Sequence, residues 1–124
     1  MNERLACGKF GEEEAKKYLQ KRGYIVLQTN YRCREGEIDL IAREGEWLVF
    51  VEVKTRRSYA YGMPCEAVDE RKRSKIIAAA QKYLLDNTIE SALRFDVIEV
   101  ICASEGDGYR LKSLNHIKFA FEEE

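Results

Sequence analysis

The feature that most limits how this chain can fold is an apolar run, VFVEVKTR, at residues 49–56. Valine and phenylalanine favour β-strands, and successive side chains of a strand point to opposite faces. Phe50, Glu52 and Lys54 would therefore share one face, while valines occupy the other. The sequence predicts a buried strand with one apolar face and one face that is apolar at one end and charged at the other.

A second strand-like segment, GEIDLIA at residues 36–42, comes just before this run. If residues 44–45 form a two-residue hairpin turn, Asp39 faces Phe50 and becomes the diagonal neighbour of Glu52. Diagonal neighbours on one face have Cα atoms about 7–8 Å apart. A one-residue slip would move Asp39 to the opposite face. The predicted register therefore brings two carboxylates together on one half-buried face.

Carboxylates that crowd on a half-buried surface are costly unless they are protonated, paired or bound to a metal. The sequence alone leaves these three explanations open. A hard cation such as Mg²⁺ prefers oxygen ligands of this kind, usually one or two carboxylates with waters and phosphate. Lys54, one step further along the same face, could then hold a water or a phosphate beside the ion.

Two helices are predicted on either side of these strands. Helical spacing from Leu5 to Leu19, closed by Gly23, puts Glu12 on the flank of the apolar stripe and points the two following glutamates away. The other helix follows Asp69, a suitable N-cap, and carries Lys72 in a basic first turn. Positive charge there opposes the helix dipole, whereas an anion would be favoured.

The remaining segments complete one domain. The 124 residues, 45% apolar and 35% charged, suit a globular α/β domain spanning 1–124, and no apolar stretch approaches a membrane span. The predicted order is one helix, three strands, one helix and two strands, which gives a mixed sheet flanked by helices. Four separated cysteines and no signal-like N-terminus predict reduced thiols and a cytoplasmic protein.

Six segments of the chain, taken in order, carry a family resemblance: GEEEAKKYLQKRGY (11–24), GEIDLI (36–41), VFVEVKTR (49–56), AVDERK (67–72), RFDV (94–97) and NHIKFAF (115–121). Together they resemble the bacterial YraN family of the PD-(D/E)XK nuclease-like superfamily. The resemblance implies a restriction-endonuclease-like αβββαβ core. By position, Asp39 and Glu52 match the metal-binding acids and Lys54 the catalytic lysine. Ile38 stands where the superfamily's name has proline.

The resemblance also implies a division of roles around the site. Glu12 matches the acidic position of the first helix, and Lys72 matches a basic position of the second. We expect Mg²⁺ or Mn²⁺ at Asp39 and Glu52, together with the main-chain carbonyl of Val53. Lys72 and Arg56 are expected to position a phosphate backbone.

The expected function is metal-dependent endonucleolytic hydrolysis of DNA, and RNA is the less favoured substrate. The expected catalytic residues are Asp39, Glu52, Lys54 and Glu12. A homodimer would suit a substrate with two strands. One alternative is a module that binds nucleic acid without cutting it, and another is an adaptor with a vestigial site. The net charge of −1 shows that any basic surface must be local.

Several other polar residues are interpreted as structural. Glu37 could support the residues that hold the metal, or it could pair with Arg34 or a neighbouring basic side chain, and the structural pairing is favoured. Asp96 is expected to make structural hydrogen bonds. His116, the one histidine, is expected to pack or cap. Aromatic residues at 59 and 61 could stack on bases or cover the core.

Overall fold

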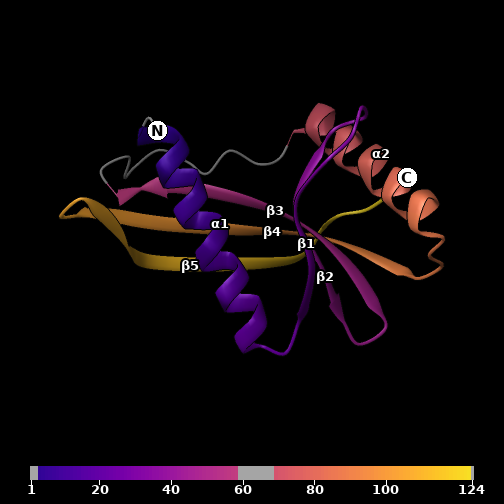
Figure 1. The fold of residues 1–124 in the computed structure, drawn as a ribbon, viewed down its shortest axis with the longest axis horizontal. Helices are drawn as coiled ribbons and strands as arrows, with labels where there is room; N and C mark the ends of the chain where they lie inside the picture. The colour runs from indigo at the N-terminus through magenta and orange to yellow at the C-terminus, as the bar shows by residue number, and fades with distance from the viewer. Residues whose placement is uncertain (1–2, 59–68, 124) are drawn as a thin grey trace.

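A computed structural model of the chain describes residues 3–58 and 69–123. The chain forms two helices and five strands in the predicted order. The strands make one sheet, and a helix packs on each side of it (Figure 1). The elements are α1 Glu3–Lys21, β1 Ile25–Arg32, β2 Glu37–Glu44, β3 Trp47–Arg57, α2 Glu70–Asn87, β4 Ala92–Glu105 and β5 Gly108–Phe121.

The sheet is mixed, and its strands lie in chain order from β1 to β5. β3 and β4 run parallel because α2 carries the chain back between them, and every other neighbouring pair is antiparallel. This arrangement confirms the expected α/β class and is consistent with a restriction-endonuclease-like core. The outer strands, β1 and β5, are longer than the sequence indicated. Their exposed residues are mostly polar, so the apolar pattern did not mark the full length of either strand.

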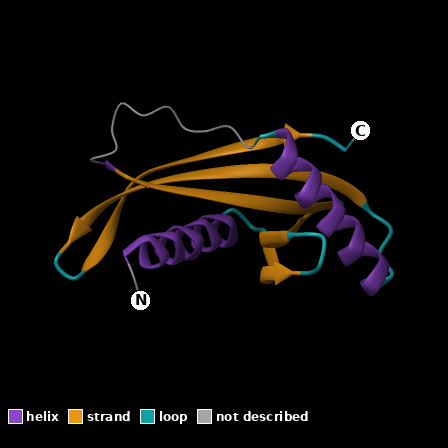
Figure 2. Cartoon of the chain, turned by 90° about the horizontal axis from the view of Figure 1, so that it is seen from above, coloured by secondary structure: helices purple, strands orange, loops and turns teal. Residues whose placement is uncertain are grey.

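Two apolar cores lie on the opposite faces of the sheet. One packs α2 against side chains such as Ile41, Leu48 and Phe50, and the other packs α1 against Val49 and Val51. Neighbouring residues of β3 therefore serve different cores, which is the alternation that its sequence predicts. Figure 2 shows α1 along one side of the long strands and α2 towards one end of the molecule.

The predicted register of the β2–β3 hairpin is wrong by two residues. The turn lies at residues 45–46, and pairing runs from Glu44 opposite Trp47 to Leu40 opposite Val51. Gly45 adopts a positive φ of 55°, a backbone conformation that glycine tolerates and other residues rarely adopt. A two-residue error keeps each side chain on its face, because side chains alternate with a period of two. The face assigned to Asp39 is therefore unchanged.

The start of α2 is fixed by a side-chain cap. Asp69 Oδ1 accepts a hydrogen bond from the main-chain nitrogen of Lys72 at 2.8 Å, as expected for an N-cap. The buried residues of this helix are Ile76, Ala79, Ala80 and Tyr83, which share one apolar stripe. This packing directs the first turn of α2, with its basic side chains, towards the ends of β2 and β3.

Helix α1 approaches β3 closely at Gly11. A Cβ atom built on Gly11 would lie 1.8 Å from Thr55 Oγ1, so a side chain at this position has no room. Ala15 and Leu19 are fully buried, as predicted, whereas Leu5 is 61% exposed and does not belong to the buried stripe. The close approach at Gly11 sets the next residue, Glu12, beside the sheet.

Within the part of the chain that the structure describes, neither helix is long and apolar enough to cross a lipid bilayer.

Candidate active site

The candidate site lies where β2 separates from β3. Main-chain pairing between these strands ends at Leu40 and Val51, and the next position of this register sets Asp39 opposite Glu52. There Asp39 Oδ2 accepts a hydrogen bond from the main-chain nitrogen of Val53 at 2.8 Å. A carboxylate thus takes the place of a main-chain acceptor, which holds Asp39 against β3.

Glu12 reaches this point from α1. Its carboxyl contacts the side chains of Asn30 and Asp39, and it lies close enough to Glu37 and Glu52 to feel their charge. Burial raises the pKa of Glu12, and the two neighbouring glutamates add to this effect, whereas the contacts with Asn30 and Asp39 oppose it. The helical periodicity therefore predicted correctly that Glu12 would face inward, and Glu13 is exposed as expected.

The strongest electrostatic effect falls on Asp39. Burial raises its pKa to about 8, with further contributions from the charges of Glu52 and Glu12, whereas the hydrogen bond from Val53 acts in the opposite direction. Asp39 also shares a hydrogen bond with Glu52, which is only 7% exposed. Three carboxyl groups from three elements therefore converge, and without a cation their mutual repulsion favours a proton on Asp39.

Two lysines lie beside these acids. The Lys72 ammonium donates to Glu52 Oε1 at 2.5 Å, and the Lys54 side chain lies next to that of Lys72. Burial by itself would lower the pKa of Lys72, but the hydrogen bond and charge of Glu52 outweigh it and raise the pKa. The structure thus brings α2 to the site through an ion pair that sequence spacing did not specify.

The other predicted residues differ in how closely they join the cluster. Val53 is held by Asp39 through its main-chain nitrogen. Arg56 follows on the same face of β3, and its Nε is buried without a hydrogen-bond partner among the described atoms. Glu37 pairs with the neighbouring Arg32 at 3.4 Å on the surface, which agrees with its structural interpretation. Tyr59 and Tyr61 lie outside the described residues.

Asn30 is a member of the site that the sequence analysis missed. Its side chain contacts the Glu12 carboxyl, and its backbone adopts a positive φ of 52° within β1. Asparagine is among the few residues that tolerate this conformation. The only signal in the sequence is an asparagine inside a strand, where that residue is unfavourable.

A basic groove opens beside Lys72, between the β1–β2 turn and the first turns of α2. Its volume is about 540 Å³. Gly36 presses against α2 there, since a Cβ atom on it would lie 2.9 Å from the carbonyl oxygen of Lys75. The residues that line it include four basic ones, Arg32, Arg71, Lys72 and Lys75, and two acidic ones, Glu37 and Asp69, so the lining carries a net positive charge.

Two carboxyl groups of the candidate site are oxygen donors of the kind that a hard divalent cation binds. Asp39 and Glu52 offer carboxylate oxygens, and Glu52 is already paired with the Lys72 ammonium. Within residues 3–58 and 69–123, no group of three or more His, Cys, Asp or Glu side chains is arranged so that it could hold a metal ion. Magnesium suits such a place, because it usually takes one or two carboxylates and keeps several waters.

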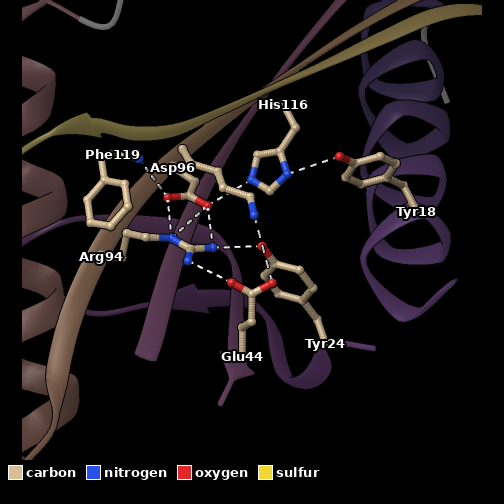
Figure 3. Close-up of polar contacts among 8 residues, drawn as sticks. Tyr18, Tyr24, Glu44, Arg94, Asp96, His116 and Phe119 are labelled. Atoms are coloured by element: carbon tan, nitrogen blue, oxygen red, sulfur yellow. Dashed lines mark hydrogen bonds and ion pairs between the residues drawn. The ribbon is translucent and has the colours of Figure 1, made fainter. Parts of the chain in front are cut away.

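A second polar cluster surrounds Asp96 and Arg94 of β4. Asp96 is fully buried, and it binds the buried guanidinium of Arg94, with Nε 3.0 Å from its Oδ1. His116 Nε2 lies 2.7 Å from Asp96 Oδ2, and the other ring nitrogen contacts the Tyr18 hydroxyl at 3.2 Å (Figure 3). Arg94 Nη1 also donates to Glu44 at 2.7 Å. These bonds tie α1, β2, β4 and β5 together.

Comparison with known proteins identifies the family. Residues 11–100 match the model of Uncharacterised protein family UPF0102. The chain belongs to the UPF0102 family. A UPF0102 protein of Clostridium botulinum strain 657 is 46% identical over 117 residues, which are 93% of each chain. A UPF0102 protein of Clostridium acetobutylicum is 46% identical over 111 residues, 89% of this chain and 91% of the relative. UPF0102 is the YraN family, so the resemblance inferred from the motifs is confirmed.

Proposed function

We propose that this UPF0102 protein is a metal-dependent nuclease that hydrolyses phosphodiester bonds in DNA, and less readily in RNA. The observation that carries the proposal is the convergence of Glu12, Asp39 and Glu52 with Lys54 and Lys72 at the point where β2 leaves β3. Carboxylates that would otherwise repel one another, set beside cationic side chains, suit chemistry on a phosphate anion.

In this proposal Asp39, Glu52 and the main-chain carbonyl of Val53 hold Mg²⁺ or Mn²⁺, and Glu12 contributes directly or through a water. The bound ion would polarise a phosphoryl oxygen and lower the pKa of a coordinated water. Asp39 already has one oxygen fixed by the nitrogen of Val53, so its other oxygen faces the cluster. That hydrogen bond restricts the carboxyl to one orientation before any ligand arrives.

The lysines would act on the substrate. Lys54 shares the face of Glu52 and would orient the attacking water and stabilise the charge that develops in the transition state. Lys72 stands between Glu52 and the basic groove, and it would bind the phosphate that approaches from there. Arg56 would hold the backbone further along β3. Such phosphate contacts supply affinity without sequence choice.

The charge of the basic groove favours a nucleic acid as the partner. No carboxylate among the described residues pairs with Arg71 or Lys75, although the helix dipole disfavours cations in this first turn. A phosphate backbone would offset both effects at once. We place this activity in the cytoplasm, and a homodimer would present two sites to a duplex or branched substrate.

A cleavage assay tests the proposal directly. Purified protein is incubated with single-stranded, duplex and branched DNA and with RNA, in Mg²⁺, Mn²⁺ or a chelator. Metal-dependent cleavage of at least one DNA is expected, and the Asp39→Asn and Glu52→Gln variants should lose it while binding the same substrate equally well or more tightly. Each substitution removes a negative charge near a polyanion and keeps the shape. Unchanged cleavage by Asp39→Asn would contradict the assignment.

Binding measured against salt concentration tests the groove separately. Lys72→Ala and Arg71→Ala should each weaken binding across sequences and reduce the salt slope by roughly one unit per lost phosphate contact. Lys82→Ala is the matched control, because it removes the same charge from the far end of α2, where Lys82 pairs with Asp86. An equal effect of all three variants would show that only net charge matters.

A second candidate function is nucleic-acid binding without cleavage. It is favoured by the ion pair between Lys72 and Glu52, since an ammonium already neutralises one of the proposed metal ligands. Tight binding of a structured DNA with no cutting in Mg²⁺ or Mn²⁺ would establish this function instead. If the protein neither binds nor cuts, and Asp39→Asn changes only thermal stability, the carboxyl cluster is structural.

A further inference from the structure

Two cysteines that are far apart in the sequence meet inside the molecule. Cys7 lies in α1 and Cys102 in β4, separated by 95 positions, and their sulfur atoms are 3.4 Å apart. Cys102 is fully buried, whereas Cys7 is 7% exposed. Both are free thiols, and neither belongs to the cluster proposed for catalysis. Their contact therefore needs an explanation of its own.

We propose that Cys7 and Cys102 form an intramolecular disulfide when the protein meets a hydroperoxide, and that this bond fastens α1 to the sheet. The inference is independent of the proposed nuclease activity. A disulfide needs a sulfur–sulfur separation of about 2.05 Å, so the two atoms must approach by roughly 1.4 Å. The bond requires rotation of the two side chains to supply this shift.

The reaction balances with a hydroperoxide as the oxidant. The Cys7 sulfur, the more accessible of the two, attacks an oxygen of the peroxide; the O–O bond breaks, a sulfenic acid forms on Cys7, and water or an alcohol leaves. The Cys102 sulfur then attacks the Cys7 sulfur. The S–S bond forms as the S–O bond breaks, and the departing hydroxide takes the proton of the Cys102 thiol and becomes water. Two thiols are oxidised, and one peroxide is reduced.

Burial sets the rate of this reaction. It raises the pKa of the Cys7 thiol to about 11, and contact with Cys102 adds to the rise. The thiolate, which is the reactive form, is therefore scarce at neutral pH. We expect slow conversion by a small, uncharged hydroperoxide such as hydrogen peroxide, and slower conversion by a bulky oxidant.

The position of the bond gives it a structural effect. Cys7 is one helical turn before Gly11, where α1 already packs directly against Thr55 of β3. A covalent bond to β4 would add a second fixed point to the same part of the helix. It would also close a loop of about 95 residues, and a long closed loop restricts the unfolded chain strongly. The oxidised protein should therefore be more stable.

The test uses a chain in which Cys33→Ser and Cys65→Ser leave Cys7 and Cys102 as the only thiols. The folded protein is treated with hydrogen peroxide, the peroxide is removed, and the protein is then denatured in the presence of excess alkylating reagent, which labels every thiol that is still free. We expect a monomer that has lost two hydrogen atoms, with the Cys7 peptide linked to the Cys102 peptide. The Tm should rise by on the order of 5–15 °C and return to its initial value with dithiothreitol.

Cys102→Ser in the same background is the matched control, and it should gain no Tm on oxidation. Three outcomes would overturn the proposal. Cys7 and Cys102 could both be alkylated after a peroxide treatment that oxidises an exposed thiol. Each sulfur could gain oxygen without a bond between the two, or the disulfide could join two molecules. If the serine variants do not fold, the peptide map of the unsubstituted chain decides, because it shows whether Cys7 is joined to Cys102 or to another cysteine.

Discussion

Single carboxyl groups illustrate how the surroundings of a residue decide its behaviour. Asp39 is partly buried and Asp96 is fully buried, yet the pKa values of the two groups shift in opposite directions. Asp39 faces Glu52 and Glu12, and its pKa rises. Burial would also raise the pKa of Asp96, but His116, Arg94 and the main-chain nitrogen of Phe119 outweigh it and lower the pKa. The difference follows from the sign of the neighbouring charges.

Asp39→Asn should stabilise the protein in the absence of metal. The amide oxygen can still accept the hydrogen bond from Val53, and the folded variant no longer has to take up the proton that Glu52 and Glu12 favour on Asp39. We expect a gain of about 1 kcal/mol, or roughly 4 °C in Tm, measured by thermal unfolding in a chelator. Added Mg²⁺ should raise the Tm of the unsubstituted protein more than that of the variant. A loss of stability in the chelator would show that the Asp39 charge is already compensated.

Asp96→Asn should destabilise the protein by about 3–5 kcal/mol at neutral pH, because it leaves the buried guanidinium of Arg94 poorly compensated. The folded pKa of Asp96 is lowered, so its stabilising effect is complete above the unfolded value of about 3.9 and is lost as pH falls through the folded value. Urea unfolding from pH 7 down to pH 2 should show the two proteins converging in acid. The exposed Glu105→Gln serves as control, and a constant difference at all pH values would contradict the argument.

Each helix carries part of the site because of how it meets the sheet. In α1 the absence of a side chain at Gly11 allows contact with Thr55, and this contact sets Glu12 against Asp39. In α2 the N-cap Asp69 fixes the first turn, from which Lys72 reaches Glu52. The carboxyl and ammonium groups of the candidate site are thus brought together by the close contact of α1 with β3 and by the capped start of α2.

Two glycine substitutions in α1 separate helix propensity from packing. Gly8→Ala should stabilise the protein by up to about 1 kcal/mol, because no atom outside the helix lies within 4 Å of the added Cβ. Gly11→Ala should instead cost about 1–3 kcal/mol, since its Cβ would overlap Thr55. Denaturant unfolding measures both changes. If Gly11→Ala is as stable as Gly8→Ala, α1 does not approach β3 as closely as described.

At the scale of the whole molecule, the strands connect two cores that no single element contains. Leu48 and Phe50 belong to the core under α2, and Val49 and Val51 belong to the core under α1. Neither core can lose its packing without disturbing β3. The buried cluster around Asp96 adds polar connections between α1, β2 and the later strands.

Unfolding should therefore be a single cooperative transition. The fluorescence of Trp47, the one tryptophan, reports on the contact with Phe119, whose ring centroid is 5.2 Å away. Far-ultraviolet circular dichroism reports mainly on the two helices. The two signals should give the same denaturant midpoint, and midpoints that differ would mean that the two cores unfold separately.

The sequence by itself determined the properties that depend on local periodicity. Alternation along β3 gave Glu52 and Lys54 a common face, helical spacing turned Glu12 inward, and Asp69 marked the start of α2. The face of Asp39 was also correct although the hairpin register was not, because an even shift leaves side chains on the same face.

Only the tertiary structure decided which distant groups meet. Because the turn lies at residues 45–46, the observed register sets Asp39 opposite Glu52, whereas the predicted register set it diagonally. The packing of α2 brings Lys72 into an ion pair with Glu52. The contact of Asn30 with Glu12 likewise depends on how the edge strand bends. Periodicity is a property of neighbouring residues along one element, whereas these contacts depend on the crossing of separate elements, which the packing of the whole core determines.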